Sequence, residues 1–354
     1  MSEMLTRWLG EFKIHRWQII LVLCLLMLAF GGKQHFAAAK DIDGVIQVAD
    51  LERTYHVHLP TSYDEKVQYP LVIALHGGGG QGNRMSTLTG FNSLGDQENF
   101  IVVYPDGYKH LWSVGWMDSQ NQTSKVDDIS FIREMINDLS SKYTIDQNRI
   151  YATGMSMGGM FSHRLAIQLS DRIAAIAPVS GTMPKKLALK TPSAKMPVLM
   201  IHGTGDPIVP YEGGHVGAKR RPQGNKIDTT NLSVMDSANY WAKNNGCQLN
   251  PVMEKLTDDV SNDSSKVMIA HYKDTHGIND VWVYTVKDGG HTWPRMGTTD
   301  KLSVDSGEIH DDIPLKFRRF RQGAGLNSKE SEASSEFDAA KIIWQFFKPL
   351  RKGA

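Results

Sequence analysis

The chain has 354 residues, of which 41% are hydrophobic and 22% are charged, so it can bury a large core. These proportions exclude a chain that is disordered throughout, and the formal net charge of +1 gives no indication of nucleic-acid binding. The two cysteines, Cys24 and Cys247, exclude a disulfide framework and a zinc ribbon. We expect Cys247 to be a small buried apolar side chain.

Residues 1–39 have the pattern of a signal peptide. Arg7, Lys13 and Arg16 precede an uncharged apolar run over 17–30, and Ala37–Ala39 suit a small-residue cleavage site. An uncleaved anchor is the alternative, although the run is slightly short for a membrane span of about 20 residues. Both interpretations export the rest of the chain. We therefore expect a secreted or periplasmic protein that meets a membrane only through this segment.

Strand-like runs then alternate with helical periodicity. The alternating residues 53–59 predict a half-buried strand that ends at Pro60. Continuous apolar runs, which are typical of central parallel strands, follow at 71–75, 100–104, 149–153, 174–179, 197–201 and 281–286.

Apolar residues near 3.6 spacing predict helices over 129–143, 157–169, 234–244 and 337–347. Strands that alternate with helices predict an α/β fold with a mostly parallel, doubly wound sheet and helices on both faces. We expect residues 40–354 to form a single catalytic domain with surface insertions near 213–232 and 295–335. The basic stretch 316–321 is either a solvated face or a contact for an anionic surface.

Residues 154–158 read Gly-Met-Ser-Met-Gly, a G-x-S-x-G motif that makes Ser156 a candidate nucleophile. A predicted strand precedes the motif and a predicted helix follows it, which is the setting of a nucleophile elbow. Glycines are needed because side chains at this sharp turn would collide with the neighbouring strand and helix. Ser156 would stand at a helix N-terminus, where the helix dipole favours developing negative charge. A strand–helix turn without chemistry is the alternative.

A serine hydroxyl needs a base and an acid that orients the base, and in this fold both follow the serine in the chain. Asp206 lies just beyond the run 197–201 and is predicted to accept the imidazole N–H, although it could merely cap the loop. His291 follows the last strand in a glycine-flanked loop and is the predicted general base. His76 and His202 also end strands, but we expect them to organise loops.

An oxyanion hole needs two backbone N–H groups. Met157 is expected to supply one, and the glycine run 77–80 the other, with Gly78 favoured and Gly77 next. A phosphate-binding loop is the rival interpretation of these glycines, but the chain has no G-K-[ST] after them.

Three tryptophans are candidates for a wall of the substrate pocket: Trp293, Trp112 and Trp116. Trp293 is the strongest because it lies two residues after His291. Ordinary packing is the alternative for Trp112 and Trp116. The expected chemistry needs no metal and no cofactor.

Several motifs in order carry a resemblance over about residues 45–348. They are Arg53-x-Tyr55-x-Val57-x-Leu59-Pro60, His76-Gly77-Gly78, Val126-Asp127-Asp128-Ile129, Asp146-x-x-Arg149-Ile150-Tyr151, 154–160, His202-Gly203-Thr204-Gly205-Asp206-Pro207, Gly289-Gly290-His291-Thr292-Trp293-Pro294 and 337–347. In these motifs the chain resembles the secreted esterases of the polyhydroxybutyrate depolymerase and feruloyl esterase type, including the LpqC-like members. The resemblance implies an α/β-hydrolase fold and the same triad of Ser156, Asp206 and His291. Family members often carry a disulfide near the position of Cys247, and this chain has no partner cysteine for it. A separate substrate-binding domain, which many polymer-degrading relatives append, is not expected either.

The sequence thus predicts an exported serine carboxylic-ester hydrolase that acts through an acyl-enzyme on a small or polymeric ester. Hydroxyalkanoate oligomers or polymer and feruloyl or acetyl esters of polysaccharide all stay open as substrates. A serine peptidase for short peptides and a non-catalytic exported binding protein on a hydrolase fold are the alternatives.

Overall fold

The computed structural model describes residues 40–116, 126–217, 228–256, 267–295 and 337–353. The predicted export segment 1–39, the middle of the first expected insertion and nearly all of the second lie outside the described residues. Among the described helices, none is both long enough and apolar enough to cross a membrane.

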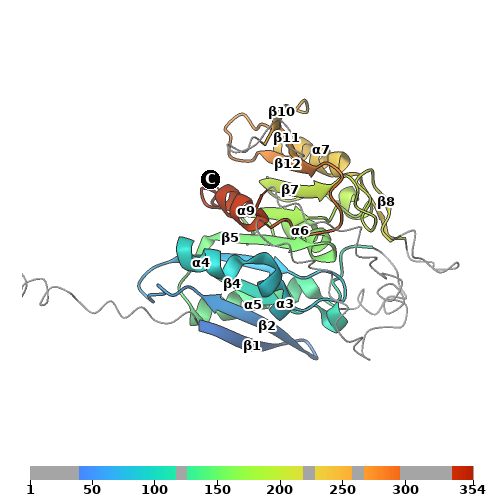
Figure 1. Ribbon diagram of the computed structural model, residues 1–354. Coiled ribbons are helices and arrows are strands. Elements are labelled where there is room, and N and C mark those ends of the chain that lie inside the picture. The colour runs from blue at the N-terminus through green and yellow to red at the C-terminus, as the bar shows by residue number, and fades with distance from the viewer. Residues whose placement is uncertain (1–39, 117–125, 218–227, 257–266, 296–336, 354) are drawn as a thin grey trace, which may run out of the picture. The chain divides into compact units, whose positions relative to one another are not determined.

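Ten strands of the described chain form one sheet in the order β1-β2-β4-β3-β5-β6-β7-β12-β11-β10 (Figure 1). They are β1 (Lys40–Val48), β2 (Leu51–Leu59), β3 (Tyr69–Leu75), β4 (Ile101–Pro105), β5 (Ile145–Met155), β6 (Ala175–Val179), β7 (Val198–Gly203), β10 (Val252–Lys255), β11 (Val267–Tyr272) and β12 (Val281–Val286). The central strands from β4 to β12 run parallel, whereas the outer strands at both edges pair antiparallel. The predicted mostly parallel sheet is therefore confirmed.

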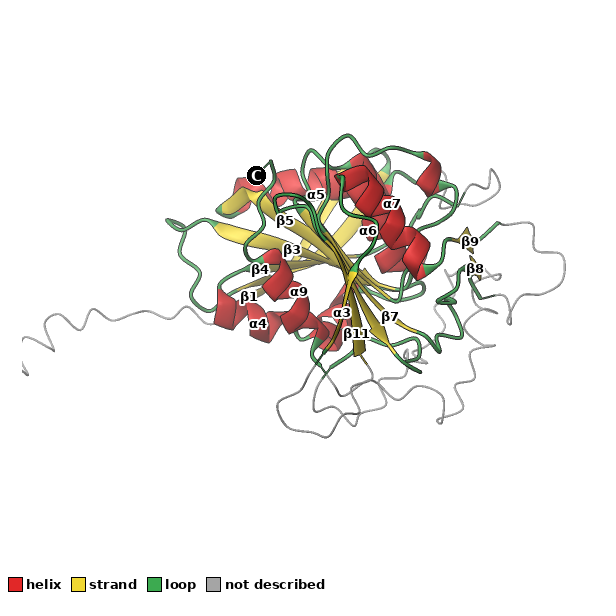
Figure 2. Ribbon diagram, turned by 90° about the horizontal axis from the view of Figure 1, so that it is seen from above, coloured by secondary structure: helices red, strands yellow, loops and turns green. Residues whose placement is uncertain are grey.

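Helices cover both faces of this sheet (Figure 2). One face carries α5 (Asp128–Lys142), α6 (Met157–Gln168) and α7 (Val234–Asn245), and the other carries α3 (Gly82–Thr89), α4 (Phe91–Glu98) and α9 (Ala339–Phe347). Short 3₁₀ turns lie at η1 (Tyr108–His110) and η3 (Leu187–Leu189). The predicted helices are all present, which confirms the doubly wound architecture.

Strand β3 shows how the sequence places two cores on one sheet. Leu71, Ile73 and Leu75 pack on the side of α5 and α6, and Val72 and Ala74 pack on the opposite side. All five side chains are fully buried. Because alternate residues of a strand point to opposite faces, a continuous apolar run is what a strand covered on both faces requires.

Two short strands, β8 (Gly214–His215) and β9 (Thr230–Asn231), form a separate antiparallel pair where the ends of the first expected insertion come together. Cys247 is a free buried thiol directly after α7, as predicted.

Candidate active site

Ser156 lies at a sharp turn between β5 and α6. Its φ of 57° and ψ of −119° are strained for a residue with a side chain. A Cβ added to Gly154 would lie 2.7 Å from the Leu75 Cβ, and one added to Gly158 would lie 2.3 Å from the Leu75 carbonyl oxygen. Only glycine fits two positions before and two positions after the serine, which is the physical reason for the G-x-S-x-G pattern.

The turn leaves the Ser156 hydroxyl available. Its backbone N–H donates to the Val179 carbonyl over 2.9 Å, and its side chain does not cap α6. Ser156 is partly exposed, whereas the first residues of α6 behind it are buried. The hydroxyl thus stands at the N-terminal end of a helix, where negative charge is favoured.

The glycine loop after β3 passes directly over this serine. A Cβ added to Gly77 would lie 3.4 Å from the Ser156 Cβ, and one added to Gly78 would lie 3.6 Å from the Met157 sulfur. Among the described residues, no acceptor is bound to the backbone N–H of Gly77, Gly78 or Met157. These amides are therefore available to an oxyanion that forms beside the serine.

His76 fixes the conformation of that loop. Its Nε2 accepts the Gly107 N–H over 2.9 Å, so its proton is on Nδ1, which donates to the Gly77 carbonyl over 2.7 Å. Burial lowers the pKa of His76 to about 4, which keeps the ring neutral and preserves this donor–acceptor pattern. His76 organises the loop, as predicted.

Asp206 and His291 meet after β7 and β12. His291 Nδ1 lies 2.7 Å from Asp206 Oδ2, and both residues are buried. Since a carboxylate only accepts, Nδ1 is the donor, and Nε2 of the neutral ring is left as an acceptor. Among the described residues, Nε2 has no hydrogen-bond partner of its own. This pair can therefore take up a proton at Nε2.

Asp206 is held from three further directions. Its Oδ1 accepts the backbone N–H groups of Ile208 and Val209 over 2.8 and 2.9 Å. His202 Nε2 donates to the Val209 carbonyl over 2.9 Å and lies 3.4 Å from Asp206 Oδ2. Burial alone would raise the pKa of Asp206. The positive charge that His291 carries when it is protonated and the hydrogen bonds of His202 and His291 outweigh it and hold the pKa well below its usual range.

His202 is thus a support of Asp206 as well as of its own loop. From the sequence we expected only the loop role. The signal that could have found the second role is the spacing of four residues between His202 and Asp206, across a turn that follows a buried strand.

The segment after β6 links the serine to the histidine loop. A Cβ added to Gly181 would lie 2.4 Å from the Ser156 carbonyl oxygen, and the hydroxyl of Ser180 donates to the Thr292 carbonyl over 3.2 Å. No hydrogen bond joins Ser156 to His291 within the described residues, and such bonds are often long in the absence of substrate. The structure therefore brings Asp206 and His291 into contact, with Ser156 beside the same loop.

The three tryptophans differ in their surroundings. Trp112 is 2% exposed, stacks on Phe161 and donates from Nε1 to the His76 carbonyl over 2.9 Å. Trp116 is partly exposed and donates to Asn231 over 2.9 Å. Trp293 is 2% exposed, and its Nε1 is the buried side-chain polar atom that lacks a partner in the described structure. Their predicted contact with substrate stays a prediction.

Comparisons with known proteins find similarity to esterases. A phospholipase/carboxylesterase family model matches residues 61–235, which include Ser156 and Asp206. Feruloyl esterase B of Piromyces equi is 29% identical over 238 residues, which are 66% of this chain and 42% of that protein, so the match spans less than half of the relative. Feruloyl esterase C of Emericella nidulans is 25% identical over 262 residues, which are 72% of this chain and 82% of that protein.

The fold is shared with a solved structure, acetyl xylan esterase from Aspergillus awamori. The TM-score is 0.53 at 15% identity, over 80% of this chain and 100% of that one. In the described part of the chain, no three His, Cys, Asp or Glu side chains are arranged to hold a metal ion. The doubly wound sheet, the carboxylesterase family match and the feruloyl esterase relatives together identify the chain as an esterase of the α/β-hydrolase fold.

Proposed function

We propose that the protein is an exported serine esterase in which Ser156 is the nucleophile, His291 the general base and Asp206 the acid that orients the base. The observation that carries the proposal is the 2.7 Å contact between His291 Nδ1 and Asp206 Oδ2, beside a serine in a strained turn. The contact fixes the imidazole tautomer that has a free Nε2, which is the form a base requires.

The reaction is acyl transfer in two halves. In the first half, His291 Nε2 takes the proton of the Ser156 hydroxyl as its oxygen attacks the ester carbonyl. The N–H groups of Gly78 and Met157 stabilise the oxyanion. When the tetrahedral intermediate collapses, His291 returns the proton to the departing alcohol oxygen and the acyl group stays on Ser156. In the second half, His291 takes a proton from water as the water oxygen attacks the acyl-serine carbonyl. When this second tetrahedral intermediate collapses, His291 returns the proton to the departing Ser156 oxygen, which releases the carboxylic acid and restores the free enzyme.

The proposed substrates are feruloyl or acetyl esters of polysaccharide, because feruloyl esterases match most of the chain. Hydroxyalkanoate oligomers or polymer are the second substrate class, which the resemblance of the motifs implies. Export rests on the charged and apolar pattern of residues 1–39.

Replacing the nucleophile tests the proposal. Ser156→Ala should lower the turnover of methyl ferulate by about 10⁴-fold or more, since the covalent route is lost. It should also abolish labelling by a fluorophosphonate probe, which reacts only with an activated serine. Ser141→Ala is the matched control, because the Ser141 hydroxyl bonds only to the Asp138 carbonyl on the surface of α5. Labelling that survives in Ser156→Ala would place the nucleophile elsewhere.

A further inference from the structure

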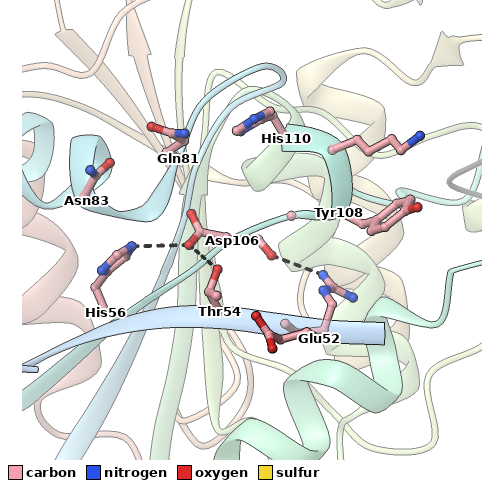
Figure 3. Close-up of a pocket in the computed structure, with 11 residues that line it drawn as sticks. Glu52, Thr54, His56, Gln81, Asn83, Asp106, Tyr108 and His110 are labelled. Atoms are coloured by element: carbon pink, nitrogen blue, oxygen red, sulfur yellow. Dashed lines mark hydrogen bonds and ion pairs between the residues drawn. The ribbon is translucent and has the colours of Figure 1, made fainter. Parts of the chain in front are cut away.

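A concave site lies at the same sheet edge as Ser156, on the side away from His291. Its volume is about 380 Å³, which is within the range of ligand sites. Residues of β2, the start of α3 and the segment 106–110 after β4 line it (Figure 3). Neither the acid–base pair nor the glycine loop of the proposed mechanism lies among its lining residues.

The floor of this β2–β4 pocket is fixed by hydrogen bonds around Asp106. Its Oδ1 accepts the Gly82 N–H over 2.8 Å, and its Oδ2 accepts the Thr54 hydroxyl over 2.7 Å and His56 Nε2 over 3.2 Å. Figure 3 shows Asp106 between His56 and Thr54, with Gln81 and His110 on the opposite side of the pocket. Such a floor is held in place before any ligand arrives.

The strongest charges of the floor are already neutralised. Arg53 is buried and pairs with Asp128 over 2.8 Å. His56 donates from both ring nitrogens, to Asp43 over 2.6 Å and to Asp106 over 3.2 Å. At the exposed side, Glu52 and Lys109 contribute one charge of each sign. The pocket is therefore suited to a neutral ligand rather than to an anion or a cation.

Several lining side chains are left with unused hydrogen-bonding groups. In the described structure, the side chains of Glu52, Gln81, Asn83 and Tyr108 make no hydrogen bond. They offer amide donors, amide and carboxylate acceptors and a phenol at the surface of one pocket. A ligand that both donates and accepts many hydrogen bonds fits this set, and vicinal hydroxyl groups of a sugar do so.

The pocket is connected to the glycine loop beside Ser156. The His110 carbonyl accepts the Gly79 N–H over 2.7 Å, and His110 Nδ1 lies 3.1 Å from the Gly80 carbonyl oxygen. Lys109 and His110 hold left-handed backbone conformations, with φ of 51° and 61°, which packing must maintain. Strand β4 is two positions from β5 in the sheet, a separation of roughly 10 Å at the usual strand spacing. A short saccharide chain spans that distance.

We propose that the β2–β4 pocket binds a neutral sugar unit in the alcohol portion of the ester substrate. The inference rests on the proposed function, because it assigns the alcohol side of the same reaction. The acyl side would then lie away from this pocket. Contacts made here help ester cleavage only when the alcohol carries a saccharide.

The test compares a small ester with a saccharide ester of the same acid. Methyl ferulate and a feruloylated arabinoxylan trisaccharide are hydrolysed by the full chain and by Asn83→Ala and Glu52→Ala. Each variant should lower kcat/KM for the trisaccharide ester by about fivefold, the worth of one net hydrogen bond, and should change that for methyl ferulate much less. Gln248→Ala is the matched control, because it removes an exposed amide after α7, outside the pocket.

A binding measurement separates the two proposals. Titration calorimetry measures how tightly the same trisaccharide, without its feruloyl group, binds to two proteins. They are Ser156→Ala and the double variant Ser156→Ala with Asn83→Ala. Binding that Asn83→Ala weakens supports the sugar site even if the wild-type chain cleaves neither ester, in which case only the proposed function fails. No binding, or equal losses on both esters in the pocket variants, would overturn the sugar site while leaving the esterase proposal intact.

Discussion

Two histidine–carboxylate pairs lie at the same edge of the sheet, on opposite sides of Ser156, and they differ in what the second ring nitrogen does. His291 uses Nδ1 to contact Asp206 and keeps Nε2 unbonded within the described structure. His56 uses both nitrogens, one for Asp43 and one for Asp106. The same two residue types therefore form one pair that can accept a proton and one that cannot.

The carboxylates of the two pairs are also supported differently. Asp206 is buried and receives two backbone N–H groups in addition to His291. Asp106 is partly exposed and connects β2, β4 and α3 through Thr54, His56 and Gly82. Asp206 fixes the orientation of a histidine that has an unbonded ring nitrogen in the described structure, whereas Asp106 connects three secondary-structure elements.

The largest expected effect comes from removing the two rings in turn. His291→Ala should lower kcat for methyl ferulate by about 10⁴-fold or more, because the proposed base is lost. His56→Ala should cause only a small fraction of that fall, because its ring has no free nitrogen. Steady-state kinetics of the two purified variants measures both. If both variants are folded by circular dichroism and lose kcat to a similar extent, the proposed difference between the two pairs is wrong.

A smaller effect is expected from His202, which positions Asp206. His202→Phe keeps a ring but removes the donor that faces Val209 O and Asp206, and kcat should fall by about tenfold with KM unchanged. His202→Gln restores an N–H and should recover part of the loss. Kinetics of the two variants on methyl ferulate provides the measurement. A fall in thermal stability without any change in kcat would show that His202 only holds its loop.

Much of this comparison could be predicted from the sequence, because the features involved depend on residues close together in the chain or on the order of the strands. The turn at Ser156 requires glycine at Gly154 and Gly158 because any Cβ there would collide with β3. Continuous apolar runs predicted the central strands, since both faces of those strands are covered. The positions of Asp206 and His291 after strands predicted their meeting, which the 2.7 Å contact between their side chains bears out. Their catalytic roles, and that of Ser156, stay predictions.

The regions that escaped prediction depend on partners far along the chain. The edge strand β1 carries three exposed charged residues, and its pairing with β2 gives it order that its own sequence does not signal. Helices α3 and α4 have eight residues each and no side-chain cap, so local propensity is weak. The β2–β4 pocket joins Glu52 to Asn83 and Tyr108, three positions that no motif connects.

The smallest expected effect concerns stability, and it distinguishes the pairs by pH. The hydrogen bond to Asp106, opposed by burial and aided by Asp43, raises the pKa of His56 from its ordinary value of 6.5 to about 9. Burial would raise the pKa of Asp106, but the hydrogen bonds from His56, Gly82 and Thr54 lower it to about 2.

Because the pKa of His56 is higher in the folded chain than in the unfolded chain, protonated His56 stabilises the fold. Its contribution to the free energy of unfolding is complete below about pH 6.5 and is lost as the pH rises through about 9. Asp106 also stabilises the folded chain, but its contribution depends on pH in the opposite direction: it is present above about pH 4 and is lost as the pH falls through about 2.

His56→Gln should therefore lower the free energy of unfolding by about 1 kcal/mol near pH 6, after allowance for the partial exposure of the ring. The difference from wild type should shrink toward zero near pH 10, as measured by urea unfolding. His276→Gln, which changes an exposed ring without a hydrogen bond in the described structure, is the matched control. A difference that stays constant from pH 6 to pH 10 would mean that His56 is not charged, and the contrast with His291 would then rest on geometry alone.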